Sequence, residues 1–167
     1  MLVRALIDEA GGRPEIALDA FRALSQGAER PVAAEATLRW TALGLKEGAM
    51  PPGEAIGRLE TLVAVWRGDA VEVEGLGRLG RLYAEAGRWR EAFTTARRAN
   101  RIFPDHPVTR ELHEETARLF EALFLTGKGD ALPRVEALAL YFDFKEFTPI
   151  GRRGDEIVRR LADRLVE

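Results

Sequence analysis

Two histidines and several neighbouring carboxylates are the side chains with which this sequence could bind a metal ion or exchange protons. Neither His106 nor His113 has a second histidine one helical turn away, and the chain has no cysteine to complete a zinc site. Adjacent carboxylates, such as Glu114 with Glu115 or residues 155–156, point apart on a helix and do not suit paired acid–base catalysis. We therefore predict no metal site and no catalytic residue, and we interpret the histidines as turn and helix-surface residues.

A glycine pattern at residues 75–80, GLGRLG, matches the G-x-G-x-x-G loop that holds the pyrophosphate of a dinucleotide. The preceding residues 71–74 alternate valine and glutamate, as a short strand would. The pyrophosphate would then lie at the N-terminus of the following helix. Such a loop needs a parallel sheet, and the sequence shows no further strand pattern. A nucleotide-binding enzyme that uses Gly75–Gly80 is therefore kept only as an alternative hypothesis. We predict no cofactor, and Gly77 has no evident packing role.

Arginines are concentrated in one stretch of the chain, at Arg78, Arg81, Arg88, Arg90, Arg97, Arg98 and Arg101. They could bind phosphates or an acidic peptide, or they could form a solvated helix face whose stems cover apolar surface. The net charge of −2 and the isoelectric point of about 5.9 give no general attraction for nucleic acid. Nucleic acid is therefore not an expected partner, and an acidic protein segment is favoured over it.

The elements that would position these side chains are helices, because apolar residues recur at intervals of three and four along most of the chain. We expect nine helical segments, near residues 2–10, 14–26, 31–48, 52–67, 69–86, 88–102, 107–126, 130–142 and 150–166. Prolines lie near the predicted starts, and glycines that tolerate a left-handed conformation lie near the predicted ends, at Gly12, Gly48, Gly87 and Gly127. Short linkers make consecutive helices antiparallel neighbours.

One helix-long pattern recurs about every 38 residues. It is marked by alanines spaced 38, 37 and 39 residues apart, namely Ala17, Ala55, Ala92 and Ala131. Apolar residues follow each alanine at offsets of one, four and seven, and the column at offset four holds Phe21, Leu59, Ala96 and Val135. These offsets fall on one helical face, and a period of this length is typical of solenoids built from helix pairs.

Residues 73–106 carry the sharpest form of this pattern. Large, large, small and aromatic residues stand at Leu76, Leu79, Gly80 and Tyr83. A second helix follows with small residues and a closing proline, at Ala92, Ala96, Ala99 and Pro104. This unit resembles a tetratricopeptide repeat. The other units match less closely, because an extra residue near Met50 interrupts the second and Phe120 occupies a usually small position.

The resemblance implies an all-α fold, a right-handed α-α superhelix of about four helix pairs plus a terminal helix, in one domain of residues 1–167. The first helix is cut short at Met1, and the last is unpaired, with one apolar face formed by Ile150, Ile157, Leu161 and Leu165. We therefore expect a fragment of a longer array, or ends that pair with another copy. Alternatively, the last helix is itself a cap. The nearby aromatic residues Tyr141, Phe142, Phe144 and Phe147 are interpreted as core, or as an anchor for a partner.

The resemblance also implies where a partner would bind, because the first helix of each pair lines the concave face. In the best-matched unit that face would hold Glu74, Gly77, Arg81, Ala84 and Glu85. The candidate partner-binding residues are Glu74, Arg78, Arg81 and Glu85. Lysines and asparagines, with which some tetratricopeptide domains hold a peptide carboxylate, are absent from these positions. Arg81 and Glu85 indicate a mixed-charge groove, or simply pair with each other across one turn.

The main hypothesis is a non-catalytic protein–protein interaction scaffold that binds a protein segment through the concave face. The second is a structural module that assembles through its chain ends. No apolar run is long enough to span a membrane, and acidic residues follow Met1 too soon for a signal peptide. The lack of cysteine fits the cytoplasm and also permits the periplasm. Arginine far outnumbers lysine, and together with abundant alanine and glycine this indicates a bacterial origin.

Overall fold

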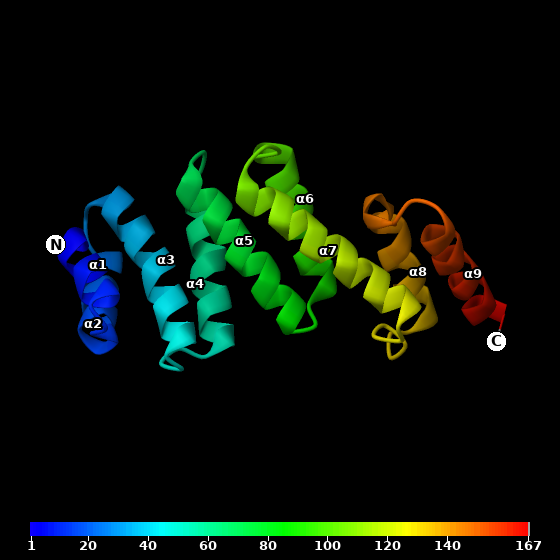
Figure 1. Cartoon of the computed structure of the whole chain (residues 1–167), viewed down its shortest axis with the longest axis horizontal. Helices are drawn as coiled ribbons and strands as arrows, with labels where there is room; N and C mark the ends of the chain where they lie inside the picture. Colours follow the sequence, from blue (N-terminus) through cyan, green and yellow to red (C-terminus); the bar gives the residue numbers. More distant parts are fainter. Residues whose placement is uncertain (167) are drawn as a thin grey trace.

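The computed structural model describes residues 1–166, which form nine α-helices and one short 3₁₀ helix and contain no strand. The α-helices are α1 (Leu2–Ala10), α2 (Pro14–Ser25), α3 (Arg30–Lys46), α4 (Pro52–Val65), α5 (Ala70–Glu85), α6 (Trp89–Ile102), α7 (Pro107–Leu125), α8 (Arg134–Asp143) and α9 (Arg152–Val166). The 3₁₀ helix η1 (Lys145–Phe147) lies between α8 and α9. Figure 1 shows the helices following one another along the long axis, with the chain ends at opposite ends of the molecule. The prediction of an all-α chain is confirmed.

Local sequence signals account for where the helices begin and end. A proline stands at the first helical position, where its missing N–H breaks no hydrogen bond, at Pro14, Pro52 and Pro107. Left-handed glycines follow four helices as predicted, with φ from 69° to 80° at Gly12, Gly48, Gly87 and Gly127. All nine predicted segments are present, and the largest shift is at α8, which begins at Arg134 instead of near residue 130.

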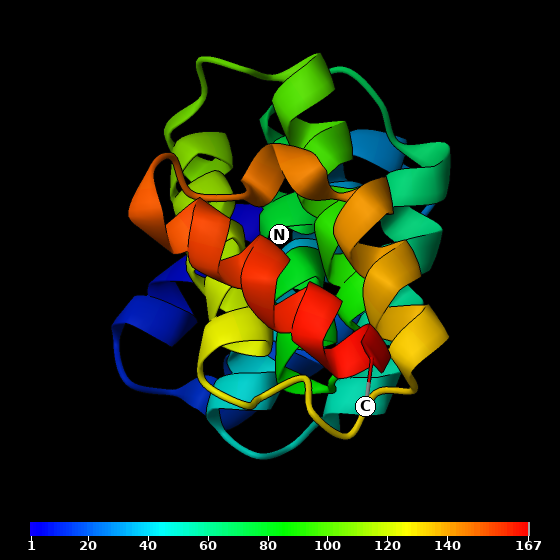
Figure 2. The same cartoon turned by 90° about the vertical axis from the view of Figure 1, so that its right-hand side faces the viewer.

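The helices pack against both sequential and alternate neighbours. Each helix from α1 to α6 contacts the next one along the chain, and α8 contacts α9. In addition, α3 contacts α5, α5 contacts α7, and α7 contacts α9. The odd-numbered helices from α3 onward therefore form a continuous layer. Figure 2 looks at the C-terminal end of the molecule, where α9, the last helix of this layer, lies toward the viewer.

The alanine column of the repeat is buried in three units and displaced in the fourth. The first three are at most 2% exposed, at Ala17, Ala55 and Ala92. The prediction for Ala131 is wrong, because this residue is exposed in the loop before α8. The loop between α7 and α8 spans residues 126–133, so α8 begins later than the repeat pattern predicts. The buried alanine of α8 is therefore Ala137, which is 1% exposed. The same displacement leaves Val135 78% exposed.

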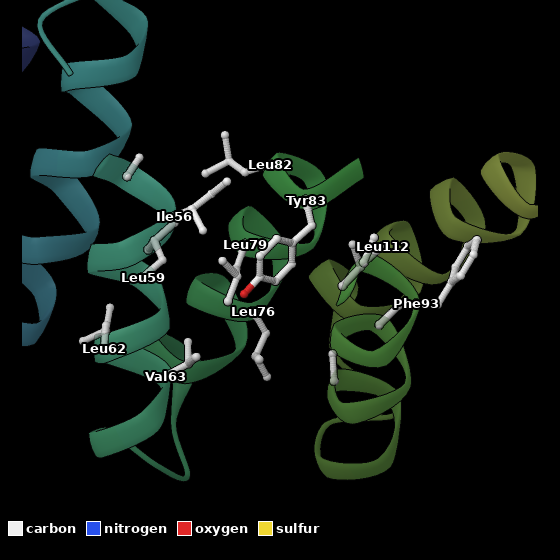
Figure 3. Packing of buried hydrophobic residues seen from close by; sticks show 14 of the residues in the cluster. Ile56, Leu59, Leu62, Val63, Leu76, Leu79, Leu82, Tyr83, Phe93 and Leu112 are labelled. Carbon is white, nitrogen blue, oxygen red and sulfur yellow. The ribbon is translucent and has the colours of Figure 1, made fainter. Parts of the chain in front are cut away.

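The central core lies between α4 and α5, where Figure 3 shows Leu59 and Leu79 among the packed side chains. Tyr83 was expected in the core and is only 6% exposed. Its hydroxyl donates a hydrogen bond of 2.6 Å to Glu60 Oε1 at the edge of this core. Burial and that hydrogen bond raise the pKa of Tyr83 above its ordinary value, so the phenol stays protonated.

Three glycines of α5 lie where a neighbouring helix approaches closely. A Cβ atom at Gly75, Gly77 or Gly80 would lie 2.5–2.9 Å from a side chain of α4 or α7, and the tightest contact is between Gly77 and Val108 Cγ1. Gly77 thus has a packing role that its sequence context does not reveal. Residues 71–80 are helical throughout. The nucleotide-binding alternative therefore loses its structural basis, because its fingerprint requires a strand and a loop.

Replacement of Gly77 by alanine should lower the free energy of unfolding by about 1–3 kcal/mol, because Val108 is stiff about χ1 and the helices must move apart. Gly57 is the matched control, since it also lies inside a helix but a Cβ there meets no atom within 4 Å. Gly57→Ala should raise the free energy of unfolding by about 0.5–1 kcal/mol. Urea unfolding followed by circular dichroism measures both. Stabilisation by both alanines would contradict the close approach of α5 and α7.

Aromatic rings form the core toward the C-terminal end. Four phenylalanines are at most 3% exposed, namely Phe93, Phe120, Phe144 and Phe147. The ring centroid of Phe93 lies 5.2–5.6 Å from those of the other three, and the rings of Phe120 and Phe147 are 6.4 Å apart. Phe142 is the exception to the predicted aromatic core, because it is 62% exposed. The predicted apolar face of the last helix is also only partly correct. Ile157 and Leu161 are buried, whereas Leu165 is 45% exposed and Ile150 lies before α9, fully exposed.

Candidate functional site

The four candidate partner-binding residues lie on α5, and all except Glu85 are half-buried. Glu74 and Arg78 form a loose ion pair across one helical turn, with 3.8 Å between the Glu74 Oε2 and an Arg78 guanidinium nitrogen. Glu85 is exposed near the end of the helix and takes no part in the ion pairs of this face. The structure therefore brings Glu74, Arg78 and Arg81 to one surface and leaves Glu85 at its margin.

Arg81 bridges α5 and α7. Its Nε donates a hydrogen bond of 2.7 Å to Glu115 Oε2, and another guanidinium nitrogen lies 3.5 Å from Glu111 Oε2. The suggested pair between Arg81 and Glu85 is therefore wrong, because α7 presents two carboxylates to the same guanidinium group. A substitution of Arg81 would remove a contact between helices, so it is an unsuitable probe of partner binding alone.

The same surface continues onto α3. Arg39 Nε donates a hydrogen bond of 2.9 Å to Glu35 Oε1. This hydrogen bond raises the pKa of Arg39, and the negative charge of Glu74 on α5 also raises it. Burial lowers the pKa of Arg78, and the positive charge of Arg39 contributes to that lowering. Together these residues form a charged band, which consists of Glu35, Arg39, Glu74, Arg78, Arg81, Glu111 and Glu115.

A small hollow of about 220 Å³ opens beside the charged band, between α3 and α5. Its lining is mainly apolar and includes two arginines, and the residues are Thr41, Ala42, Leu45, Leu59, Arg78, Arg81 and Leu82. The hollow has room for an apolar side chain of a partner. Carboxylates of the same partner, lying beside that side chain, could pair with Arg78 and Arg81. This chemistry suits recognition of a protein segment that carries an apolar residue next to an acidic one.

A larger groove lies over α3 and between α2 and α4. At its centre the guanidinium carbon of Arg58 lies 3.9 Å from the ring centroid of Trp40. On one side is a hollow of about 500 Å³, lined mainly by apolar atoms and including Ala33, Thr37, Gly57, Val65 and Trp66. On the other side is a more polar hollow of about 600 Å³, which includes Glu15, Asp19 and Arg22. We call the two hollows together the Trp40 groove.

The Trp40 groove was not predicted from the sequence, although one sequence pattern indicates it. Gly53, Gly57 and Thr61 recur at intervals of four along α4, and all three line the groove. Small residues at this spacing leave one face of a helix hollow. The pattern alone does not distinguish a hollow from a close helix contact, because small residues also let another helix pack closely, as at Gly77. The positions of the neighbouring helices decide between the two.

The arginines between residues 78 and 101 do not form one basic surface. Apart from Arg101, each has an ion pair within the described part of the chain. Arg90 lies 2.5 Å from Asp143 Oδ2, and Arg97 Nε lies 2.6 Å from Glu146 Oε1, so both connect α6 to the region around η1. Except for Arg78, whose pair lies within α5, the paired arginines join neighbouring elements, which neither the phosphate-binding nor the solvated-face interpretation had anticipated.

Arg98 belongs to a buried ion pair. Glu72, which is 1% exposed, accepts hydrogen bonds from Arg98 at 2.5 Å and from the Gly68 N–H at 2.7 Å. Arg98 also donates to the Val63 carbonyl at 2.8 Å. Burial by itself raises the pKa of Glu72, but the hydrogen bonds from Gly68 and Arg98 outweigh it, so the pKa lies below its ordinary value. This network connects α4, α5 and α6.

Both histidines have structural roles. His106 Nδ1 accepts a hydrogen bond of 3.2 Å from the Val108 N–H and so caps α7. The ring of His113 lies 5.2 Å from that of Phe147, so it packs on the core edge and is more than a surface residue. Within residues 1–166, no group of three or more metal-ligating side chains is gathered together. None of the helices in this range is long and apolar enough to cross a bilayer.

No protein-family model, curated protein or solved structure matches the chain. The class of protein is therefore given by the fold alone, an all-α chain in residues 1–166. The resemblance of residues 73–106 to a tetratricopeptide repeat rests on their own pattern and not on a matched relative.

Proposed function

We propose that the protein is a non-catalytic scaffold, a right-handed superhelix of tetratricopeptide-like helix pairs that binds a segment of another protein. The repeat pattern of residues 73–106 supports this proposal, as does the continuous layer formed by α3, α5, α7 and α9. In arrays of this kind the first helices of the pairs line a concave binding surface. The odd-numbered helices are the first helices here.

The observation that carries the proposal is the charged band with its adjacent hollow. The band spans three helices of the odd-numbered layer, and the hollow lies between two of them. A partner must compete with ion pairs that are already formed, so binding should depend on ionic strength. The Trp40 groove is the second candidate surface, because its apolar hollow is more than twice as large.

Affinity capture from a lysate of the source organism tests this function. Arg78→Gln removes one charge from the band without breaking the bridge made by Arg81, and we expect at least about tenfold lower retention of a specific partner, equal to about 1.4 kcal/mol. Gly57→Leu fills the Trp40 groove, where a Cβ meets no atom within 4 Å. Arg134→Gln, at an exposed position of α8, is the matched control for loss of one arginine.

The three variants distinguish the surfaces. Loss of a partner with Arg78→Gln alone would support the charged band. Loss of a partner with Gly57→Leu alone would indicate that the partner binds in the Trp40 groove and not at the charged band. Equal retention of every protein by all three variants would contradict a scaffold that binds through either surface. Melting temperatures of the variants show whether a loss reflects unfolding.

A further inference from the structure

Exposed large apolar side chains are concentrated at the two ends of the molecule. In the described part of the chain, nearly all of them lie within residues 1–16 or 135–166, and only Val65 and Ile102 lie elsewhere. Scattered exposed apolar residues are normal on protein surfaces, but a concentration on one element marks an interaction site. The terminal helix α9 carries the most regular of these surfaces.

Exposed apolar residues form a stripe along α9. Val158, Ala162 and Leu165 follow at intervals of four and three, which places them on one helical face. Val158 is 50% exposed and Leu165 is 45% exposed. This α9 stripe adjoins the face that buries Ile157 and Leu161 in the core. The apolar surface of α9 is therefore wider than its packing within the chain requires.

We propose that the α9 stripe binds a second copy of this chain, with the two α9 helices antiparallel about a two-fold axis near Ala162. The stripe is self-complementary in this orientation, since reversal places Val158 opposite the partner's Leu165. The two alanines then meet near the axis, where their small side chains let the helices approach closely. A two-fold interface uses one patch on both copies, as this geometry does.

The charges beside the stripe favour the same orientation. Arg159 and Asp163 lie along one edge of it, on the side away from the core. Antiparallel packing brings these edges together, so each Arg159 faces the partner's Asp163. Asp163 has no ion pair within residues 1–166, while Arg159 contacts Glu156 of its own helix at 2.8 Å. A parallel two-fold pair would instead place the two charged edges on opposite sides of the interface, where Arg159 and the partner's Asp163 could not meet.

This inference goes beyond the proposed scaffold function, because α9 contributes no residue to the charged band or to the Trp40 groove. The two can fail separately. A monomeric protein could still bind a partner segment, and a dimer could form without one.

Cysteine crosslinking tests the pairing directly, because the chain has no cysteine of its own. Ala162→Cys should give a disulfide-linked dimer under mild oxidation at least about tenfold faster than Arg152→Cys, since cysteines near the axis meet at a high effective concentration. In the antiparallel pair the two residues at position 152 lie about 25–30 Å apart along the helix axis. Equal rates for the two variants would overturn the proposal.

The oligomeric state of the full chain provides a second measurement. Light scattering should show a dimer, and Val158→Glu should make it a monomer by burying a charge in the stripe. Val65→Glu, on a residue that is 61% exposed but far from α9, should leave the dimer intact. Asp163→Arg should weaken the dimer about tenfold, and Arg159→Asp added to it should restore pairing. A wild-type monomer at high concentration, or a head-to-tail polymer, would overturn the proposal.

Discussion

Replacement of Phe93 by alanine should lower the free energy of unfolding by about 3–5 kcal/mol, the usual cost of removing a buried aromatic ring. Phe93 is 0% exposed, and its ring packs edge-on against Phe120 at 5.5 Å. It also lies 5.2 Å from Phe144 and 5.6 Å from Phe147. One side chain of α6 thus contacts α7 and the segment before α9, so the cavity would loosen three elements together.

The matched control for Phe93→Ala is Phe142→Ala, because Phe142 is 62% exposed. Its free energy of unfolding should change by less than about 0.5 kcal/mol, as for most surface substitutions. Urea unfolding of both variants, followed by circular dichroism, is the measurement. Helical arrays can lose cooperativity when one interface weakens, so Phe93→Ala should also broaden the transition. Similar small effects of both substitutions would contradict the aromatic core.

Removal of the buried carboxylate in Glu72→Ala should lower the free energy of unfolding by about 3–5 kcal/mol. The substitution leaves the N–H of Gly68 without its acceptor and the positive charge of Arg98 without its carboxylate, so that Arg98 keeps only the Val63 carbonyl at the junction of α4, α5 and α6. Glu114→Ala is the control, because its pair with Arg118 is 70% exposed on both sides. That exposed pair contributes at most about 1 kcal/mol.

The pH dependence of the Glu72 effect has a definite sign. The pKa of Glu72 is lower in the folded protein than in the unfolded chain, so the unfolded chain takes up the proton first as pH falls. The stability contributed by this carboxylate is complete above the unfolded pKa of about 4.3 and is lost as pH falls through the folded pKa. The stability difference between wild type and Glu72→Ala should therefore shrink below about pH 4. A constant difference between pH 7 and pH 3 would argue against an ionised Glu72.

Helix positions are the part of the fold that sequence patterns predict well. Pro52 and Pro107 begin helices because they lack the N–H that a first helical position does not use. Gly48 and Gly87 end helices because a left-handed residue needs no Cβ. These are properties of single residues and their immediate neighbours, so they act wherever the rest of the chain lies.

The repeat pattern fails where the chain length between helices changes. The column at Ala131 continues a period of about 38 residues, but the loop before α8 shifts the buried alanine to Ala137. Periodicity assumes equal units, and a loop of different length displaces every later column. Exposure of Val135 follows from the same shift.

In the candidate site, too, spacing along the chain predicts some features, whereas helix packing decides the others. Glu74, Arg78 and Arg81 can be assigned to one side of a helix from their spacing, and the structure places them there, half-buried. The partner of Arg81 is on α7, more than thirty residues away, and no spacing rule identifies it. Gly57 and Gly77 are alike as glycines inside helices, yet one faces a hollow and the other touches Val108.

By itself, then, the sequence determined which segments are helical, where they end and which of their faces are apolar, because backbone propensity and helical periodicity act over a few residues. The tertiary structure decided which charges pair, which glycines are packed, where the surface is hollow and which apolar stripe is left uncovered on α9. Those outcomes depend on distances between residues far apart in the chain, and helix packing sets these distances.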